Sequence, residues 1–308
     1  MIFNISITFD TEAIPLAERN RLTECSEGGE LYYNNRKIAN FEGVEISVRG
    51  SKMQAKCSLH KFYYKTLYGT LDNSQQFTME NARTAIDLLF ERLGVDQERA
   101  KVTLFEIGLN IPTECDPLEY ITLIESVGQK GGKEFFIDAN YKRDRQKTTI
   151  KTKTIKKVFK IYDKGFEMVD RKRTEPTGEN ILRIETIYRR QSRSLKDLFD
   201  PENLHRLARG FYRDWAQVTF ARTIIGDKGT RQSQIAMAEN ILTLGRDGYL
   251  AQLKEDHANN RISYKSVKVA RQFIKNWDTN KHKYRAEPSI YENEYRNRLL
   301  TLFNTSTI

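Results

Sequence analysis

Two short apolar runs decide how this chain folds: Val158-Phe-Lys-Ile-Tyr-Asp-Lys164 and Ile181-Leu-Arg-Ile-Glu-Thr-Ile-Tyr188. Both are rich in β-branched and aromatic residues, which favour strands. Each run also carries one polar residue where burial alone would favour an aliphatic side chain, namely Tyr162 in the first and Glu185 in the second. The runs therefore predict two strands, each holding one side chain that packing does not explain.

The rest of the chain divides into a part with strand patterns and a part with helical patterns. Its 308 residues suffice for one large domain or two of ordinary size. Strand patterns dominate the first two-thirds, although a helix is predicted over residues 78–94 and another over residues 117–126. From Ser192 onward apolar residues recur at helical spacing. We therefore expect an α+β fold, mostly antiparallel sheet with flanking helices, in which a catalytic domain (residues 1–191) precedes a helical C-terminal region (residues 192–308).

The C-terminal region has a further pattern of its own. Helices are predicted over residues 233–244, 246–259 and 263–279. The last two are joined by a turn at residues 259–261, and the final helix carries four cations: Lys265, Lys268, Arg271 and Lys275. Two interpretations stay open, a helix-turn-helix that binds DNA and a plain pair of antiparallel helices, which is the commoner arrangement.

The charge balance favours a polyanionic partner. The chain has 51 basic and 41 acidic residues, a net charge of +10 and a pI near 9.3, and such a balance is typical of proteins that bind nucleic acid. The region from Lys142 to Lys164 is the most basic, with ten Lys or Arg and two Asp. It predicts a DNA-contacting hairpin with arms over residues 133–141 and 154–162, and a solvated surface loop is the alternative.

Several other classes of protein are not indicated. No apolar run approaches the roughly 20 residues that cross a bilayer, so no membrane segment is expected. The first residues lack a basic stretch and include Asp10 and Glu12, which predicts a first strand instead of a signal peptide. The three cysteines form no CxxC pair, so neither a disulfide framework nor a zinc site is indicated, and a reducing cytoplasm fits.

The motifs of common catalytic classes are also missing from the sequence. It contains no Walker A loop, no GxGxxG after a strand, no GxSxG and no HExxH. The four histidines are scattered, so no pair is separated by a single bulky apolar residue. A metal ion would therefore be held by oxygen ligands, which suit Mg²⁺ or Mn²⁺.

Glu106 and Glu185 are the natural candidates for metal ligands. Each interrupts a strand-like run, Thr-Leu-Phe-Glu-Ile-Gly-Leu-Asn-Ile (103–111) and the run 181–188. Ionised carboxylates in such settings are costly unless they are paired or bound to a metal, and a divalent cation would relieve the repulsion between two of them. The alternative is that each faces solvent or pairs with a cation such as Arg183 or Lys160.

Tyr162 is the candidate nucleophile. A tyrosine with a pKa near 10 needs help to attack a phosphodiester, and a nearby cation, Lys160 or Lys164, or the metal would favour the phenolate. The product would be a phosphotyrosine that stores the bond energy for rejoining. Core packing is the alternative for any single tyrosine, and Tyr141 is the competing candidate.

The order of four segments is more specific than any one of them. They are SLHKFYYKTLYGT from residue 58, TLFEIGLNI from residue 103, VFKIYDKGFEM from residue 158 and ILRIETIYRR from residue 181. Over roughly residues 44–200 this series resembles the rolling-circle replication initiators of filamentous phages and small plasmids, the gene II protein type. The resemblance implies that Glu106 and Glu185 bind the metal and that Tyr162 nicks DNA. It also implies phosphate contacts for Lys61 and Lys164.

The nucleophile is where the chain departs from the related plasmid initiators. In those proteins the nucleophile lies on the strand before the one with a pattern like Lys-Ile-Tyr-Asp-Lys (160–164), which points to Tyr141. The Gly-Ser-Arg that follows their tyrosine is replaced here by Lys142-Arg143-Asp144, and the spacing is longer. The choice between Tyr162 and Tyr141 therefore stays open.

The resemblance implies an enzyme that nicks and rejoins one DNA strand through a 5′-phosphotyrosine, with Mg²⁺ or Mn²⁺. It would act on an origin hairpin or single strand in the cytoplasm of a bacterial host, with a host helicase and polymerase as candidate partners and a homodimer as a candidate assembly. The alternatives are a non-catalytic DNA-binding protein of a mobile element and an RNA-binding or structural protein. The expected DNA-binding residues are Lys61, Lys142, Arg143, Arg145, Lys160 and Arg183.

Overall fold

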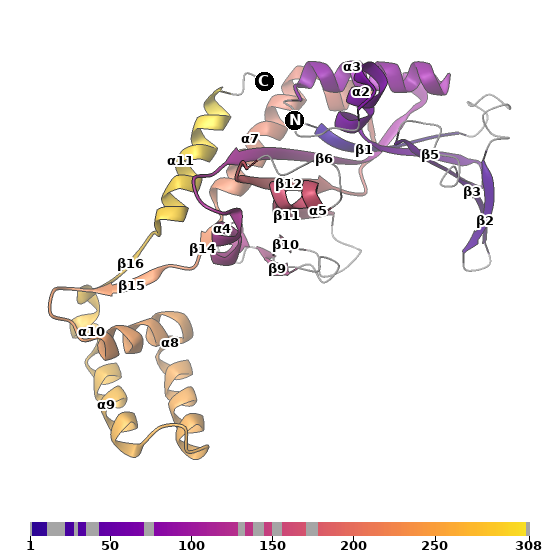
Figure 1. Cartoon of the computed structure of the whole chain (residues 1–308). Helices are drawn as coiled ribbons and strands as arrows, with labels where there is room; N and C mark the ends of the chain where they lie inside the picture. Colours follow the sequence, from indigo (N-terminus) through magenta and orange to yellow (C-terminus); the bar gives the residue numbers. More distant parts are fainter. Residues whose placement is uncertain are drawn as a thin grey trace. The chain divides into compact units, whose positions relative to one another are not determined.

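The computed structural model (Figure 1) describes most of the chain. The described residues are 2–10, 22–27, 30–34, 43–70, 77–128, 133–137, 145–149, 156–170 and 178–305. Within these ranges the fold is mixed α and β, with antiparallel strands toward the N-terminus and helices toward the C-terminus. The expected α+β fold class is confirmed.

One antiparallel sheet organises the N-terminal part. Its strands follow the order β2-β3-β4-β5-β1-β6-β12-β11-β10-β9, and β13 also pairs with β6. The first strand forms where the sequence predicts it, and β4 and β5 form a hairpin that turns at Gly50 (φ 57°). The strands are β1 (Ile2–Asp10), β2 (Thr23–Glu27), β3 (Glu30–Asn34), β4 (Glu45–Arg49), β5 (Lys52–Ser58), β6 (Lys101–Pro112), β9 (Phe136–Ile137), β10 (Gln146–Thr148), β11 (Lys157–Asp163), β12 (Ile181–Tyr188) and β13 (Arg193–Ser194).

The expected pairing of residues 133–141 with residues 154–162 is wrong in the described part of both arms. β11 pairs with β10, and β10 pairs with β9, so an extra strand separates the two arms. The basic stretch itself supplies this strand, because Gln146 and Thr148 alternate with Lys147 and are buried. Tyr162 therefore lies opposite Gln146.

Register assigns the polar side chains to one face of this sheet. Residues directly opposite one another share a face. Tyr162 lies opposite Arg183, Lys160 lies opposite Glu185, and Glu106 lies opposite Ile187. Ile187 shares a face with Arg183 and Glu185, because alternate residues of a strand do so. One face of the sheet, which we call the polar face, therefore carries all five polar side chains: Glu106, Lys160, Tyr162, Arg183 and Glu185.

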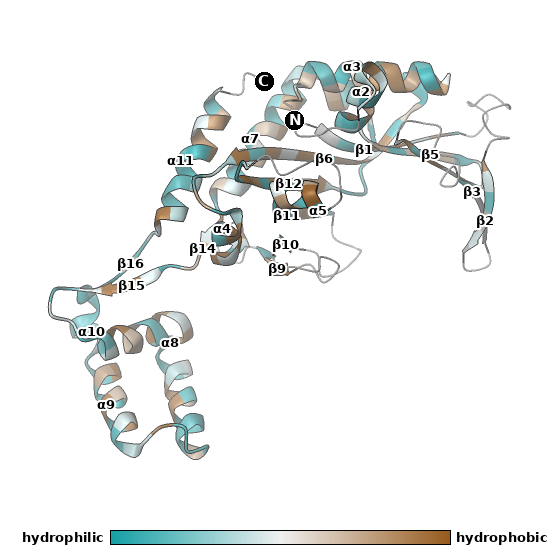
Figure 2. Ribbon diagram, viewed as in Figure 1, coloured by the Kyte–Doolittle hydropathy of each residue, from teal (hydrophilic) through white to brown (hydrophobic). Residues whose placement is uncertain are grey.

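The opposite face, called here the helix-covered face, packs against helices. Trp215 is fully buried there, contacting the Phe159 ring at 5.7 Å and donating a hydrogen bond of 3.0 Å to Thr186 Oγ1. Ile5 and Ile7 of β1 are buried on this face, where β1 contacts α2 and α3. In Figure 2 the apolar residues, drawn brown, follow β6 and β12 along the centre of the sheet. The helices are α2 (Leu59–Tyr68), α3 (Met79–Leu93), α4 (Pro117–Leu123), α6 (Leu195–Phe199) and α7 (Pro201–Ala216).

Local signals explain the ends of these helices. The helix predicted over residues 78–94 is confirmed as α3, which begins with a reciprocal capping box between Thr78 and Asn81 and ends at Gly94 (φ 65°). The helix predicted over residues 117–126 ends earlier, at Leu123, because residues 124–127 form β7. The second sheet has the order β14-β7-β8, with strands β7 (Ile124–Val127), β8 (Lys133–Glu134) and β14 (Thr219–Phe220).

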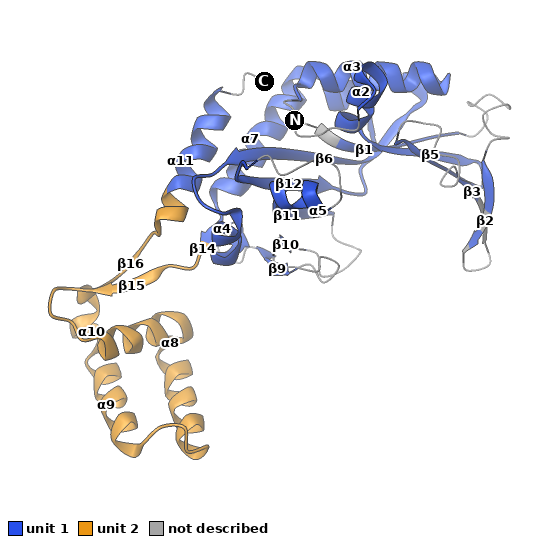
Figure 3. Ribbon diagram, viewed as in Figure 1, with its two compact units in different colours: residues 1–219, 294–308 blue, residues 220–293 orange. Residues whose placement is uncertain are grey.

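The chain divides into two compact units (Figure 3): residues 1–219 with 294–308, and residues 220–293. This division differs from the boundary expected between residues 191 and 192. The reason is that α6, α7 and most of the C-terminal helix α11 (Ile290–Thr305) pack with the sheet. Tyr295 of α11, for example, donates a hydrogen bond of 3.1 Å to the carbonyl oxygen of Trp215.

The second unit is helical and has its own core. It includes a ribbon of β15 (Thr223–Gly226) and β16 (Tyr284–Glu287). The two helices predicted around residue 245 form α8 (Gln232–Ala258), which is interrupted by the non-helical Gly245 (φ 73°, ψ 169°). The third predicted helix is shorter than expected and is followed by α10 (Trp277–Asn280). The core consists of Ile224, Ala238, Ile241, Tyr249, Leu253, Ala270, Ile274 and Trp277.

The helix predicted over residues 263–279 forms as α9 (Tyr264–Lys275), which contacts α8. Its cations Lys265, Lys268, Arg271 and Lys275 are all exposed. The remaining elements are α5 (Lys164–Asp170), η2 (Gln97–Arg99) and η3 (Lys281–Lys283). No helix in the described ranges is both long and apolar enough to span a membrane.

Candidate active site on the polar face

Two buried carboxylates lie on neighbouring strands of the polar face. Glu106 on β6 and Glu185 on β12 are each 5% exposed. Glu185 lies opposite Gly108, two residues beyond Glu106, so the two acids are diagonal neighbours, and such neighbours have Cα atoms roughly 7–8 Å apart. Because Gly108 has no side chain, β6 places nothing directly opposite Glu185.

Glu185 is held by two donors on one oxygen. The Tyr162 hydroxyl donates to Glu185 Oε1 at 2.7 Å, and Arg183 Nε donates to the same atom at 2.6 Å. Arg183 Nη1 also donates to Asn110 Oδ1 at 3.0 Å. Burial alone would raise the pKa of Glu185, but the charges of Arg183 and Lys160 and these hydrogen bonds outweigh it and hold the pKa below its ordinary value. Glu185 is therefore the ionised member of the pair.

Glu106 has fewer partners and the opposite shift. Asn4 Nδ2 on β1 donates to its Oε1 at 2.8 Å. Burial and then the charge of Glu185 raise the pKa of Glu106 to about 8, against the lowering effects of Lys160, Arg183 and Asn4. Two like charges in one buried place push their pKa values apart. Near neutral pH the carboxyl of Glu106 therefore tends to keep its proton.

This shift predicts how stability depends on pH. The pKa of Glu106 is raised from 4.5 to about 8 on folding, so between these values the folded chain holds a proton that the unfolded chain has lost. The stability from this group is full at low pH and falls as pH rises, by about 1.4 kcal/mol per pH unit. We expect urea unfolding at pH 5 and pH 8 to show this loss in the wild type and not in Glu106→Gln. Equal pH slopes for the two proteins would contradict the shift.

Tyr162 is a protonated donor in this arrangement. Its side chain is buried, and burial followed by the charge of Glu185 raises the pKa of the hydroxyl well above 10. Lys160, which lies opposite Glu185, is half-buried. The tyrosine and the acid pair thus meet on one face, with cations beside them.

Lys164 is less accessible than a phosphate contact requires. It is 1% exposed and its Nζ lies 2.7 Å from Glu167 Oε2, within α5. Burial lowers the pKa of Lys164, although the nearby Glu167 opposes this shift. The charge of Glu167 also raises the pKa of Tyr162, which indicates that this ion pair borders the acid pair. The geometry favours a structural role for Lys164 over a direct contact with DNA.

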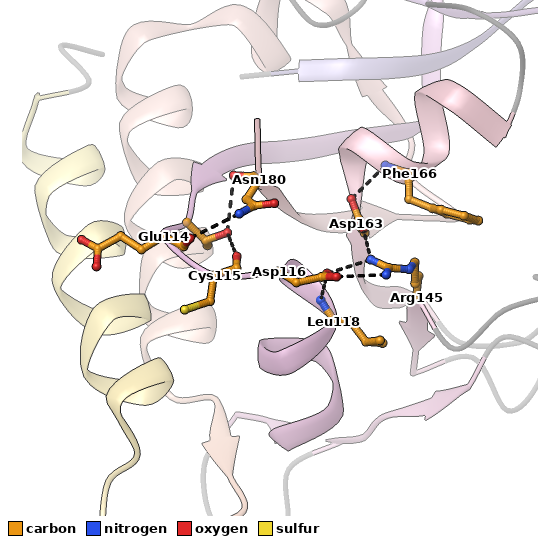
Figure 4. A network of polar contacts seen from close by, with 9 residues as sticks. Glu114, Cys115, Asp116, Leu118, Arg145, Asp163, Phe166 and Asn180 are labelled. Carbon is orange, nitrogen blue, oxygen red and sulfur yellow. Dashed lines mark hydrogen bonds and ion pairs between the residues drawn. The ribbon is translucent and has the colours of Figure 1, made fainter. Parts of the chain in front are cut away.

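Arg145 is also engaged by carboxylates (Figure 4). Its Nη1 lies 2.7 Å from Asp116 Oδ1 and 2.6 Å from Asp163 Oδ2, and its Nη2 lies 3.0 Å from Asp116 Oδ2. Asp163 Oδ1 in turn accepts a hydrogen bond of 2.9 Å from the backbone N–H of Phe166. Arg145 therefore braces the junction of β11 and α5 against the first turn of α4.

Of the remaining expected residues, one lies away from this site and three fall outside the part of the chain that the structure describes. Tyr141, Lys142 and Arg143 lie outside the described residues. Lys61 belongs to α2, which packs against β1 on the helix-covered face, away from the acid pair. Among the expected residues that the structure describes, Tyr162, Lys160, Arg183 and the two acids therefore lie together on the polar face.

Three residues of the site were missed by the sequence analysis: Asn4, Asn110 and Glu167. The first two had a readable signal, because the period of two in a strand places Asn110 on the same face as Glu106, and Asn4 on the same face of β1 as Ser6 and Thr8. Glu167 had none, since its approach to Tyr162 depends on how α5 folds back from β11.

The donor set fits a divalent ion only in part. Carboxylate oxygens are the ligands that Mg²⁺ and Mn²⁺ prefer, and the repulsion that raises the pKa of Glu106 is the kind that a cation relieves. However, in the described ranges no group of three or more His, Cys, Asp or Glu side chains is arranged to hold a metal. Glu106 and Glu185 would therefore hold such an ion together with water or phosphate oxygens.

Comparison with known proteins identifies no family for the chain. No protein-family model matches it, and no curated protein matches it in sequence. Among solved structures, the chain is similar to a rolling circle replication initiator protein from Geobacillus stearothermophilus. The match has 9% sequence identity and a TM-score of 0.36, and it covers 75% of this chain and 88% of the other. Chains at this TM-score need not share a fold, so the geometry of the site carries the argument.

Proposed function

We propose that the chain is a rolling-circle replication initiator that nicks and rejoins one DNA strand. One observation carries the proposal: a buried acid pair lies on the polar face of the sheet, with a tyrosine hydroxyl hydrogen-bonded to one of the acids. A protein that needed this region only for stability would be better served by apolar residues, because buried charges cost free energy even when they are paired.

In the proposed reaction the Tyr162 oxygen attacks the phosphorus of one phosphodiester. The bond from phosphorus to the 3′ oxygen breaks, the 3′ oxygen takes up a proton, and the tyrosine holds the 5′ phosphate. The reverse attack by a 3′ hydroxyl rejoins the strand and restores the tyrosine proton. Tyr162 must lose its proton first, and Arg183 is the neighbouring charge that lowers its pKa.

A divalent ion bound by Glu106 and Glu185 would supply the positive charge that polarises the scissile phosphate. The residues of the chain prepare this place in two ways. Asn4 and Arg183 orient the two carboxylates through hydrogen bonds, and Lys160 adds a half-buried cation beside them. Arg183 also keeps Glu185 ionised, which is the form that binds a cation.

DNA as the substrate is supported by charge. The net charge of +10 favours a polyanion, and the exposed cations of α9 add a basic surface to the second unit. None of Lys265, Lys268, Arg271 and Lys275 has an ion pair with another described residue. We propose that this surface contacts the phosphate backbone, as an extension of the origin-binding function. Host helicase and polymerase remain proposed partners, and a homodimer remains a proposed assembly.

The test is a nicking assay with the full chain and supercoiled DNA that carries the origin. With Mg²⁺ or Mn²⁺ we expect a nicked circle with protein covalently attached at the 5′ end. EDTA should stop the reaction completely, because Glu106 and Glu185 would then lack their ion. Nicking that continues in EDTA would contradict the metal role, and the absence of any covalent product would contradict the tyrosine mechanism.

A second candidate function is non-catalytic DNA binding in a mobile element. The observation that favours it is that Arg183 and Lys164 are both occupied by carboxylates, while Tyr162 is protonated. The same assay separates the two candidates, since a binding protein shifts the mobility of the DNA but leaves it supercoiled.

A further inference from the structure

A groove with three arginines runs along the outer side of α7, on the other side of the sheet from the acid pair. Its volume is about 730 Å³, and the described part of its lining comes from residues between Pro201 and Arg213. We call it the arginine groove. The residues used below are Glu202, His205, Arg206, Arg209, Gly210 and Arg213.

The arginines point away from the core because of helix geometry. Leu204, Phe211 and Trp215 are the buried residues of α7. At 100° per residue, Arg206, Arg209 and Arg213 fall on the opposite side of the helix from Trp215, and all three are exposed. These three arginines therefore take no part in packing α7 against the sheet.

Carboxylates of the described residues do not neutralise the arginines of the groove. Arg206 donates to the side chain of Asn203, while Arg209 and Arg213 form no ion pair with any other described residue. The neighbouring acid Asp214 is already bound by Lys157. Glu202 is the single acid in the described lining, against three arginines and the exposed His205. The groove is therefore a concentrated positive surface.

Gly210 keeps the surface beside the arginines open. Glycine in a helix interior is unfavourable compared with alanine, and a side chain added at Gly210 would meet nothing within 4 Å. Packing therefore gives no reason for glycine here. Its lack of a side chain lets another molecule approach the helix.

We propose that the arginine groove binds the backbone of duplex DNA, at a site separate from the nicking centre. From Arg206 to Arg213 there are seven steps along the helix, or about 10 Å, which matches the axial length of three intervals between successive phosphates of one strand, at about 3.4 Å each. The described lining has no Phe, Tyr or Trp, the larger rings on which single-strand sites rely for base stacking, and His205 is its one ring. Duplex DNA is thus favoured over a single strand, and the contact positions the protein without reading sequence.

The proposal rests on DNA being the partner, but not on nicking chemistry. The test is fluorescence anisotropy of the full chain with a labelled duplex of unrelated sequence, in EDTA, at several salt concentrations. Each of Arg209→Gln and Arg213→Gln should weaken binding several-fold and reduce the slope of log K against log salt by about 0.9. The matched control, Arg99→Gln, removes an exposed arginine of η2 outside the groove and should change neither quantity.

A charge pair at Gly210 gives a second test. Gly210→Glu and Gly210→Lys both place a better helix former in open space, so neither should lower the thermal midpoint. The first should weaken duplex binding and the second should strengthen it. Equal effects of both substitutions would overturn the proposal.

Three other results would also overturn it: unchanged binding in both arginine variants, equal losses for duplex and single-strand probes, or competition by polyglutamate as strong as by DNA. Nicking separates this failure from failure of the proposed function. If the arginine variants bind and nick normally, the groove is not a DNA site and the function stands. If no covalent adduct forms but the arginine effects are seen, the groove stands and the function fails.

Discussion

Tyr162→Phe is expected to abolish the covalent protein–DNA adduct while leaving DNA binding unchanged. The substitution removes only the oxygen that would attack phosphorus, and the buried ring keeps its contacts. The adduct is measured on denaturing gels with 5′-labelled origin DNA, and binding is measured by anisotropy without metal.

The fold should survive this change. The lost hydrogen bond is worth about 1.5–3 kcal/mol, because its acceptor Glu185 is ionised, and Arg183 Nε still donates to the same oxygen. The melting of Tyr162→Phe therefore controls for misfolding. A variant that remains folded and still forms the adduct would rule out Tyr162 as the nucleophile.

Tyr141→Phe is the matched comparison. It changes the competing tyrosine, which lies outside the described residues. If this variant loses the adduct and Tyr162→Phe keeps it, Tyr141 is the nucleophile and Tyr162 is a positioning residue that orients Glu185 through its 2.7 Å hydrogen bond. If both variants keep the adduct, neither tyrosine is the nucleophile.

Arg183→Met is expected to cause the largest loss of stability, about 3–5 kcal/mol. Arg183 is 2% exposed and joins Glu185 to Asn110 across two strands. Without it, a buried carboxylate is left facing a second acid, Glu106. The loss is measured by urea unfolding at pH 7.

Two further variants show whether charge is the cause. Arg246→Met removes an arginine from an exposed pair with Asp278, and such pairs contribute little, so its stability should stay near that of the wild type. The double variant Arg183→Met with Glu185→Met removes both charges and should lose less than Arg183→Met alone. A greater loss in the double variant would show that packing, not the unpaired carboxylate, sets the cost.

Strand periodicity made a good part of the site predictable. A period of two places Arg183 with Glu185 and places Glu106 with Gly108 and Asn110, and these groups do share the polar face. Helix signals were equally local: Thr78 and Gly94 bound α3, and Gly245 breaks α8 where two helices were predicted. Such features depend on residues within one or two turns of one another.

The partners of the charged groups were not predictable in this way. Lys164 was expected at a phosphate and is buried against Glu167, and Arg145 was expected at DNA and is braced by Asp116 and Asp163. Whether a cation is free depends on which carboxylate reaches it, and Asp116 lies 29 residues before Arg145. The expected hairpin was also wrong, because β10 pairs with both β11 and β9 and so separates its two arms.

The sequence by itself determined the alternation of the strands, the ends of the helices and the presence of two acids and a tyrosine at unusual positions. Only the tertiary structure decided that β6 lies beside β12, so that Glu106 and Glu185 meet and the pKa of one is raised while that of the other is lowered. It also decided that Asn4, 102 residues away, holds Glu106. Periodicity assigns each side chain to a face, whereas strand order, which assigns its neighbours, depends on how the whole sheet packs.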